Sequence, residues 1–203
     1  MKTWELGTSG SLIYRFFDAI RNNLNHKLSS YLYSFIADSH RAKVIEVGSG
    51  PGYSASLLNR YSTVSEAVLL DIDSEVIQLA GVRDSTLKTT VGNLLHSPFL
   101  NNSFDLVYNS STIEHIPDLN TAFSEMARIC RPGGIIFIGI PCKYGPLFPF
   151  SLLPPTGSIG AWIGRFIPRQ EILLLSDHLS LNLIGELFYF YRFFRGYLFQ
   201  KTT

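Results

Sequence analysis

The residues best suited to chemistry lie in one short segment, Val44-Ile-Glu-Val-Gly-Ser-Gly-Pro-Gly52. An apolar run typical of a buried strand contains one acid, Glu46, and leads into glycines at alternate positions, Gly48, Gly50 and Gly52. Because glycine has no Cβ, such a backbone can turn tightly and come close to a ligand. A helix that begins after the turn would point free N–H groups at that ligand. The segment therefore predicts a binding site for a nucleotide-type cofactor.

The spacing of the glycines distinguishes between two kinds of cofactor. The dinucleotide fingerprint is G-x-G-x-x-G, and its third glycine lets the helix pack closely on the strand. Here Tyr53 occupies that third position, and the pattern is instead E-x-G-x-G-x-G. An acid suits S-adenosylmethionine (SAM), which carries an ammonium and no phosphate, better than it suits the pyrophosphate of NAD. The pattern favours SAM, although an ordinary strand-to-helix turn stays open as an interpretation of this segment alone.

Polar residues also follow the next three predicted strands. Asp71 lies about 20 residues past the Gly-rich turn, where an acid can accept hydrogen bonds from two ribose hydroxyls. One such residue is usually only a turn former or a helix cap. Ligands of parallel sheets bind beyond the carboxyl ends of the strands, so polar residues at every strand end indicate one shared site. The other residues at these ends are Gly92, Asn93, Leu94, Asn109, Ser110 and Ser111.

Hydrophobic periodicity predicts the elements that position these residues. Strands and helices alternate from Ala42 onward, which indicates an α/β fold with a parallel sheet, right-handed crossovers and helices on both faces. Ser11–Ile36 is predicted to form a pair of amphipathic helices that cover the edge or mouth of the sheet, with a basic amphipathic membrane anchor as the alternative. The predicted strands are Lys43–Val47, Ala67–Leu70, Thr89–Val91, Phe104–Asn109, Ile135–Ile140 and Leu181–Leu187, and the helices are Tyr53–Arg60, Ser74–Leu79, Leu119–Cys130 (stopped by Arg131-Pro-Gly-Gly134) and Arg169–Leu175.

Length, charge and cysteine content narrow the class of protein. The 203 residues suggest a single domain, with a helical cap in residues 1–40, a cofactor-binding core in 42–141, and a hydrophobic loop with the last strands in 142–203. A net charge of +1 gives no reason to expect a nucleic-acid partner. Cys130 and Cys142 have no metal-ligand spacing, so we expect no metal site and a reducing, cytoplasmic location. No signal peptide is expected.

The segment Lys43–Pro141 resembles the Methyltransf_11 type of class I SAM-dependent methyltransferases, the group that includes ubiquinone and menaquinone methylases. The resemblance implies a Rossmann-like three-layer αβα sandwich with a mostly parallel seven-stranded sheet and one antiparallel strand. That strand would come from the aromatic tail Phe188–Phe199. The matching stretches are Val44–Gly52, Leu69-Leu-Asp-Ile-Asp73, Gly92-Asn93, Asn102-Ser-Phe-Asp-Leu-Val-Tyr108, Ile113-Glu-His-Ile-Pro117 and Leu119 through Arg131-Pro-Gly-Gly134.

The resemblance implies a role for each matching residue. Glu46 and the turn would surround the methionine portion of SAM, Asp71 would hold the ribose, and Ile72 would pack on the adenine face. At position 93 the family usually has Asp, which accepts a hydrogen bond from the adenine amine with charge assistance that Asn93 lacks. The remaining implied contacts are the backbone of Gly48, Ser49, Gly50 and Gly52 around the methionine, Asn93 and Leu94 at the adenine edge, and Asn109, Ser110 and Ser111 near the sulfonium.

A general base is needed only if the acceptor loses a proton during methyl transfer. His115 is the best candidate, because it follows the fourth strand beside the expected pocket. The alternative is that Glu114-His115 is structural and fixes the start of the next helix. His178 and Tyr14 are weaker candidates.

The acceptor must be inferred from residues 142–203, which lie outside the resemblance. Aromatic residues interleaved with Arg192 and Arg195 suit an apolar acceptor or a membrane interface. We therefore expect a small hydrophobic acceptor, such as a quinone precursor or a lipid, and peripheral membrane contact. A SAM-binding partner or regulatory subunit without catalysis is the alternative. The apolar residues of the loop between Lys143 and Arg165 are Phe148, Phe150, Leu152, Leu153, Ile159 and Trp162.

Overall fold

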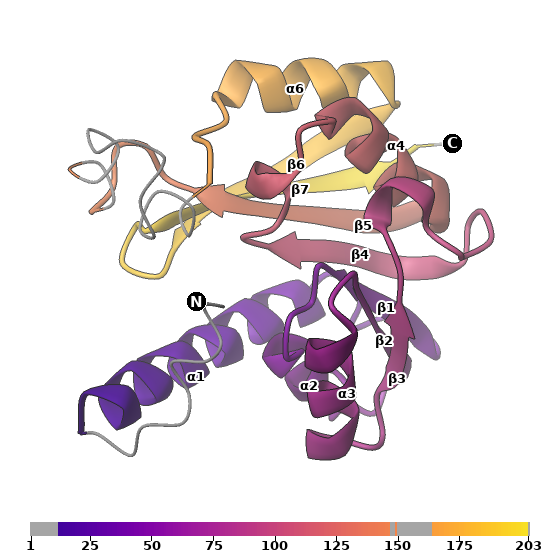
Figure 1. Cartoon of the computed structure of the whole chain (residues 1–203). Helices are drawn as coiled ribbons and strands as arrows, with labels where there is room; N and C mark the ends of the chain where they lie inside the picture. Colours follow the sequence, from indigo (N-terminus) through magenta and orange to yellow (C-terminus); the bar gives the residue numbers. More distant parts are fainter. Residues whose placement is uncertain (1–11, 147–148, 150–163, 203) are drawn as a thin grey trace.

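The computed structural model describes residues 12–146, 149 and 164–202, and these residues form one seven-stranded sheet (Figure 1). The strand order is β3-β2-β1-β4-β5-β7-β6. β7 runs antiparallel to β5 and β6, whereas the other neighbours pair in parallel, which confirms the predicted Rossmann-like α/β fold. The strands are β1 Ala42–Val47, β2 Val64–Asp71, β3 Lys88–Val91, β4 Phe104–Ser110, β5 Cys130–Pro141, β6 Leu181–Tyr189 and β7 Phe194–Lys201.

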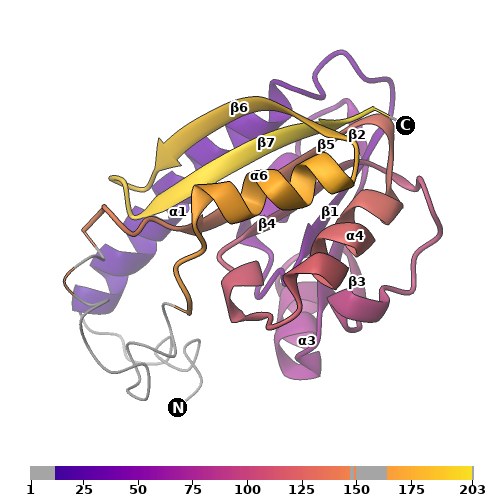
Figure 2. The same cartoon turned by 90° about the horizontal axis from the view of Figure 1, so that it is seen from above.

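Helices cover both faces of the sheet. α1, α2 and α3 pack on one face, and α4 and α6 pack on the other (Figure 1). Seen from above, α4 and α6 lie in front of the strands and most of α1 lies behind them (Figure 2). The helices are α1 Leu12–Tyr33, α2 Tyr53–Leu58, α3 Ser74–Arg83, α4 Leu119–Ile129 and α6 Arg169–His178, with short 3-10 helices η2 Leu94–His96 and η3 Ile113–His115.

The central strands are apolar on both faces because each face meets a helical layer. In β1, Ile45 and Val47 belong to the core beneath α4 and α6, whereas Val44 belongs to the core beneath α1 and α2. The C-terminal half of α1 contributes Leu28 and Leu32 to that second core, where both are almost fully buried. Burial of this kind supplies the main driving force that holds the layers together.

Most boundaries differ from the sequence predictions by a few residues, and three differences change the layout. The expected pair of N-terminal helices is one helix, α1. The helix predicted to end at Cys130 ends at Ile129, because Cys130 pairs with Phe104 and starts β5. β6 continues to Tyr189, which makes the connection to β7 a tight hairpin. The apolar loop residues Phe148, Phe150, Leu152, Leu153, Ile159 and Trp162 lie outside the described residues, as does the side chain of Tyr14.

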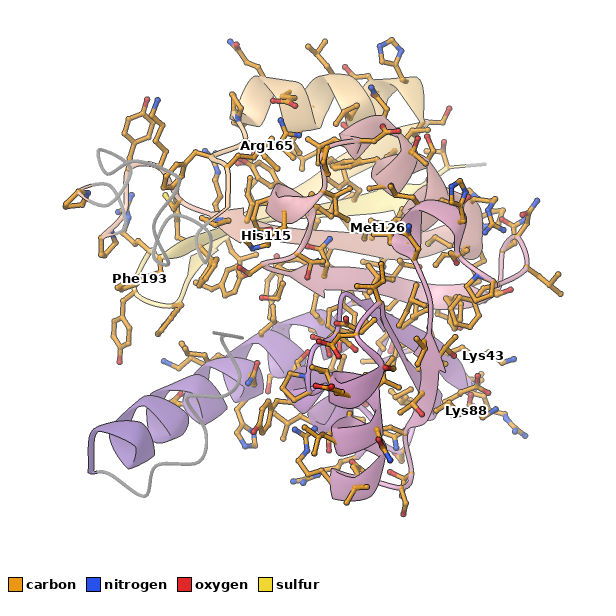
Figure 3. All side chains as sticks on the ribbon, viewed as in Figure 1. Lys43, Lys88, His115, Met126, Arg165 and Phe193 are labelled. Atoms are coloured by element: carbon orange, nitrogen blue, oxygen red, sulfur yellow. The ribbon has the colours of Figure 1, made fainter. Side chains whose placement is uncertain are left out.

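The carboxyl ends of β1 and β4 define the place where a ligand would bind. These strands are neighbours, but the chain leaves them in opposite directions along the sheet, which opens a crevice at this switch point. The β6–β7 hairpin reaches the same edge, since the Cys142 N–H after β5 donates to the Phe193 carbonyl at 2.8 Å. Figure 3 shows His115 and Phe193 on the side of the molecule away from Lys43 and Lys88, which lie at the starts of β1 and β3.

Candidate functional site

The Gly-rich turn after β1 is left-handed at all three glycines, with φ of 61° at Gly48, 51° at Gly50 and 64° at Gly52. A Cβ on Gly48 would lie 2.0 Å from a Thr112 side-chain carbon, and one on Gly52 would lie 2.4 Å from a Leu69 methyl carbon. A Cβ on Gly50 would meet nothing within 4 Å. Gly48 and Gly52 are therefore required by protein packing, whereas Gly50 borders open space that a ligand could enter.

Asp71, at the end of β2, is tied to this turn. Its Oδ2 accepts a hydrogen bond from the Gly50 N–H at 2.7 Å, and its Oδ1 accepts one from the Asp73 N–H at 3.0 Å. Each carboxylate oxygen has a second lone pair that could accept from a ligand hydroxyl. The next residue, Ile72, leaves 71% of its surface exposed, an apolar side chain beside the open space.

Glu46 is a buried acid behind the turn, with 7% of its surface exposed. Its Oε2 accepts from the Tyr108 hydroxyl at 3.1 Å and from the Ala55 N–H at 3.2 Å, and the Tyr108 hydroxyl lies 2.9 Å from that of Ser54. Burial raises the pKa of Glu46 from 4.5 to about 7, against the lowering effect of these hydrogen bonds. A cation placed beside Glu46 would favour its ionised form. Sequence analysis missed both hydroxyl partners, which lie on α2 and β4.

The residues after β3 have local structural roles in addition to any ligand contact. Asn93 caps η2, since its amide oxygen accepts from the Leu95 N–H at 2.9 Å, and the residue is exposed. The Leu94 side chain is buried in the core beneath α4. In the Gly-rich turn, the buried Ser49 donates its hydroxyl proton to the Gly50 carbonyl at 3.3 Å.

The last residues of β4 point to alternate faces of the sheet, as strand geometry requires. The fully buried Asn109 donates to the sulfur of Met126 in α4 at 3.5 Å, and no described residue gives its amide oxygen a hydrogen bond. Ser110 lies on the other face, where its hydroxyl is 2.9 Å from that of Tyr189. Ser110 therefore faces the aromatic hairpin, while the Asn109 side chain is directed into the α4 side of the core.

The segment after β4 brings Ser111, Glu114 and His115 together. The Ser111 hydroxyl donates to Glu114 Oε1 at 2.6 Å, and His115 Nε2 lies 3.9 Å from the same oxygen. Burial raises the pKa of Glu114 to about 7, whereas it lowers the pKa of His115. The segment touches the Gly-rich turn, because the Thr112 hydroxyl donates to the Gly48 carbonyl at 3.0 Å. His178 lies elsewhere, in the last turn of α6 before β6 begins at the opposite edge of the sheet.

The β6–β7 hairpin adds an aromatic wall at this edge. Tyr189 and Phe194 are paired across the hairpin with ring centroids 5.5 Å apart, and Phe190 and Phe193 stack at 4.9 Å. Phe190, Tyr191 and Arg192 all have positive φ, an unusual run for residues with bulky side chains. Tyr191 is 74% exposed.

Among the described residues, no group of three His, Cys, Asp or Glu side chains could hold a metal ion. No helix in the described part of the chain has the length and apolar character needed to span a membrane.

Known proteins share this domain and fold. Residues 45–138 match the family of methyltransferase domains described as Methyltransf_11. The ubiquinone/menaquinone biosynthesis C-methyltransferase UbiE of Dinoroseobacter shibae is 26% identical over 158 residues, covering 70% of this chain and 62% of that protein. The malonyl-[acyl-carrier protein] O-methyltransferase of Erwinia billingiae is 25% identical over 155 residues, covering 76% and 61%. The chain thus spans less than two thirds of these relatives' lengths.

A solved geranyl diphosphate methyltransferase in complex with SAM has the same fold, with a TM-score of 0.71 at 15% identity over 97% of this chain and 94% of that one. The names of these three proteins carry three different acceptors, so the similarity identifies the methyl donor rather than the acceptor. Residues 45–138 are therefore a methyltransferase domain of the class I SAM-dependent type, and the chain has the fold of these enzymes.

Proposed function

We propose that this protein transfers a methyl group from SAM to a small hydrophobic acceptor. The observation that carries the proposal is the open face of Gly50, which has the Asp71 carboxylate hydrogen-bonded to its N–H and the buried acid Glu46 behind the same turn. When bound, SAM supplies a methyl carbon already activated by a sulfonium. The protein then has to align the acceptor and exclude water.

The geometry supports a specific set of contacts with SAM. Glu46 would hold the ammonium, which would draw its carboxyl into the ionised form. Asp71 would accept hydrogen bonds from the ribose hydroxyls on lone pairs that the turn does not use. Ile72 would cover one face of the adenine, which explains an exposed isoleucine at this position. The backbone of Gly48, Ser49, Gly50 and Gly52 would follow the methionine chain.

The remaining contacts would come from the ends of β3 and β4. The Asn93 amide oxygen already accepts from Leu95, so the adenine amine would share that oxygen. Leu94 and Asn109 would contribute backbone groups, since their side chains are buried in the core. Ser110 and Ser111 would border the methyl group. His115 would stand at the rim, half-exposed and with its pKa lowered by burial, as one candidate for a base.

The hydrophobic nature of the acceptor is inferred from the hairpin beside the crevice. Tyr189, Phe190 and Phe194 give the site an aromatic side wall, and stacked rings suit a planar or isoprenoid-like apolar ligand. A charged, polar acceptor would find few partners there, because Arg195 is already paired with Glu186.

The same hairpin supports contact with an anionic membrane surface. Tyr191 and Tyr144 are exposed by 74% and 83%, and each is next to a basic residue, Arg192 and Lys143. The two loops are adjacent, since the Gly145 backbone packs against the Arg192 carbonyl. Exposed tyrosines beside cations suit the headgroup layer of a bilayer. A hydrophobic acceptor could then reach the site from the membrane.

Two experiments test these proposals. Release of S-adenosylhomocysteine is measured with a panel of quinone precursors, prenylated phenols and fatty acyl compounds. Turnover of an apolar member supports the proposed function, whereas SAM binding without turnover of any member would favour the non-catalytic subunit.

Co-sedimentation with phosphatidylglycerol vesicles at low salt tests membrane contact, and Leu100→Ser, which changes another exposed apolar residue, is the control. The double variant Tyr144→Ser/Tyr191→Ser should bind the vesicles less than wild type, whereas Leu100→Ser should bind them as wild type does. Wild-type protein that stays in the supernatant would contradict membrane contact.

A further inference from the structure

Ser111 has an unusual backbone. It is not glycine, yet its φ is 65°, in the left-handed region, directly after β4. That conformation costs roughly 1 kcal/mol for a residue with a Cβ. The position is held by a hydrogen bond from the Ser111 N–H to the Gly139 carbonyl at 2.9 Å. Strain of this kind, fixed by its surroundings, is frequent at functional sites.

The Ser111 hydroxyl is hydrogen-bonded to a buried acid. Ser111 is only partly buried, whereas the side chain of its partner Glu114 has no exposed surface. Glu114 Oε1 accepts from Ser111, and Glu114 Oε2 is buried and has no hydrogen-bond partner among the described residues. A buried carboxyl oxygen without a partner is costly, so native structures rarely keep one without a reason.

The chain that covers Glu114 keeps it away from water. Gly164, with φ of 69°, is so close that a Cβ there would lie 2.7 Å from Glu114 Cγ and 2.9 Å from a His115 ring carbon. The Arg165 N–H donates to the Glu114 carbonyl at 3.2 Å, while the Arg165 guanidinium pairs instead with Glu171 at 3.5 Å. Figure 3 shows His115 and Arg165 on neighbouring parts of the chain.

Few charged groups face Glu114. His115 on η3 forms its one ion pair among the described residues, at 3.9 Å. Burial raises the pKa of Tyr189 on β6 above its ordinary value, and the charges of Glu114 and, more weakly, of Glu46 act in the same direction. Tyr189 therefore stays protonated and cannot compete for a proton near neutral pH.

We infer that Ser111 and Glu114 form a relay that removes the proton from a hydroxyl group of the acceptor during methyl transfer. The inference rests on the proposed function. As the acceptor oxygen bonds to the methyl carbon, the carbon–sulfur bond breaks and its electron pair stays on sulfur. The acceptor proton passes to Ser111 Oγ, and the proton of Ser111 passes to the Glu114 carboxylate. The products are the methyl ether, S-adenosylhomocysteine and a protonated Glu114.

Geometry favours this relay over direct action by His115. The Ser111 hydroxyl belongs to the segment that touches the Gly-rich turn through Thr112, whereas the His115 ring is 40% exposed and packs against Gly164. Burial also places the pKa of Glu114 at about 7, close to the value that suits a general base at neutral pH. Such a relay implies that the acceptor is a hydrophobic alcohol or phenol and that the reaction is an O-methylation.

The test uses nonylphenol as acceptor and the variants Ser111→Gly, Glu114→Gln and His115→Asn. Glycine suits φ of 65°, so Ser111→Gly removes the hydroxyl while relieving the backbone. We expect it to keep its melting temperature and SAM affinity and to lose about 100-fold in kcat, the usual contribution of a positioned base. In wild type and His115→Asn, kcat/KM should rise with pH through about 7, and Glu114→Gln should lose that rise.

A second readout does not depend on turnover. In infrared titration, the buried carboxyls of Glu46 and Glu114 should both ionise near pH 7 in wild type; Glu114→Gln should lose the part of the protonated-carboxyl band that remains in Glu46→Gln. The relay is wrong if Ser111→Gly keeps kcat within threefold, or if the pH dependence survives in Glu114→Gln and disappears in His115→Asn. Wild type that binds SAM but never methylates nonylphenol or another apolar alcohol contradicts the relay and leaves the SAM site standing. Failure to bind SAM would instead overturn the proposed function.

Discussion

The hydroxyl of Tyr189 on β6 lies 2.9 Å from the hydroxyl of Ser110 on β4, although two other strands separate β6 from β4. The contact is possible because Gly139 on β5 and Gly196 on β7 are paired and leave the sheet surface bare. A Cβ on Gly139 would lie 2.0 Å from the Tyr189 hydroxyl. The tyrosine thus crosses the sheet and joins the aromatic hairpin to the strand end beside the proposed methyl group.

Replacing Tyr189 should affect the acceptor more than the cofactor. Tyr189→Phe removes one hydrogen bond but keeps the ring, so we expect unchanged SAM affinity and a KM for an apolar acceptor raised about fivefold, which corresponds to roughly 1 kcal/mol. Steady-state kinetics with SAM titration checks both values. Tyr191→Phe, on the same hairpin but exposed, is the matched control. If Tyr189→Phe weakened SAM binding as much as it raised the KM of the acceptor, the hairpin would belong to the cofactor site instead.

Substitution of Gly50 should weaken SAM binding without destabilising the fold more than a comparable substitution elsewhere. Gly50→Ala places a methyl group in open space and should weaken SAM binding about tenfold or more by obstructing the ligand. Gly133→Ala carries the same backbone penalty, since Gly133 has φ of 73° and nothing within 4 Å of its Cβ position. Both variants should unfold at similar temperatures in a thermal melt. If Gly50→Ala and Gly133→Ala bound SAM with equal affinity, SAM would not bind against Gly50.

Asp71→Asn should weaken SAM binding about tenfold to a hundredfold. The substitution removes the negative charge of the carboxylate that accepts from the Gly50 N–H and would accept from the ribose. Hydrogen bonds to charged groups contribute roughly 1.5–3 kcal/mol. Asp118→Asn is the control, because Asp118 caps α4 through the Thr121 N–H. Isothermal titration of both variants decides. An effect of Asp118→Asn as large as that of Asp71→Asn would point to general destabilisation.

The two buried acids should make stability fall as pH rises. Glu46 and Glu114 have pKa values near 7 in the folded protein and an ordinary value of 4.5, so between these limits the folded state binds more protons than the unfolded state. The free energy of unfolding should therefore decrease from about pH 5 to pH 8, by up to roughly 3 kcal/mol for each acid. The lowered pKa of His115 acts in the opposite direction within this window.

Urea denaturation at several pH values measures this effect. Glu46→Gln and Glu114→Gln should each flatten the pH dependence of the unfolding free energy relative to wild type, and His115→Asn should steepen it. A wild type whose stability rises steadily to pH 8, with no difference in the Gln variants, would show that neither acid is protonated in the folded state.

The sequence predicted the fold well because its signals are local. Apolar strand runs, the glycine turn and strand-end acids all lie within a few residues of one another, so periodicity and turn chemistry were sufficient for β1 to β5. The supports of the site come from elsewhere in the chain. Tyr108 is 62 residues from Glu46, and Tyr189 is 79 residues from Ser110. No spacing rule connects such pairs, because only the packing of distant strands brings them together.

Burial was the other property that periodicity could not supply. Glu114 was visible in the Ile113-Glu-His-Ile-Pro117 stretch, but nothing there shows that its side chain is fully enclosed by Gly164 and Arg165. The left-handed backbone of Ser111 was equally hidden, since serine has no strong preference for that conformation. The burial of Glu114 depends on the chain that returns over it at Gly164, and the backbone of Ser111 is held by Gly139 on β5.

The Gly-rich turn is the proposed SAM site, and isothermal titration of the wild-type protein with SAM, and separately with NAD, tests this most directly. We expect saturable binding of one SAM per chain, weakened in Gly50→Ala and unchanged in Gly133→Ala, and no heat of binding with NAD. Tighter binding of NAD than of SAM, or SAM binding that is indifferent to Gly50→Ala, would contradict it.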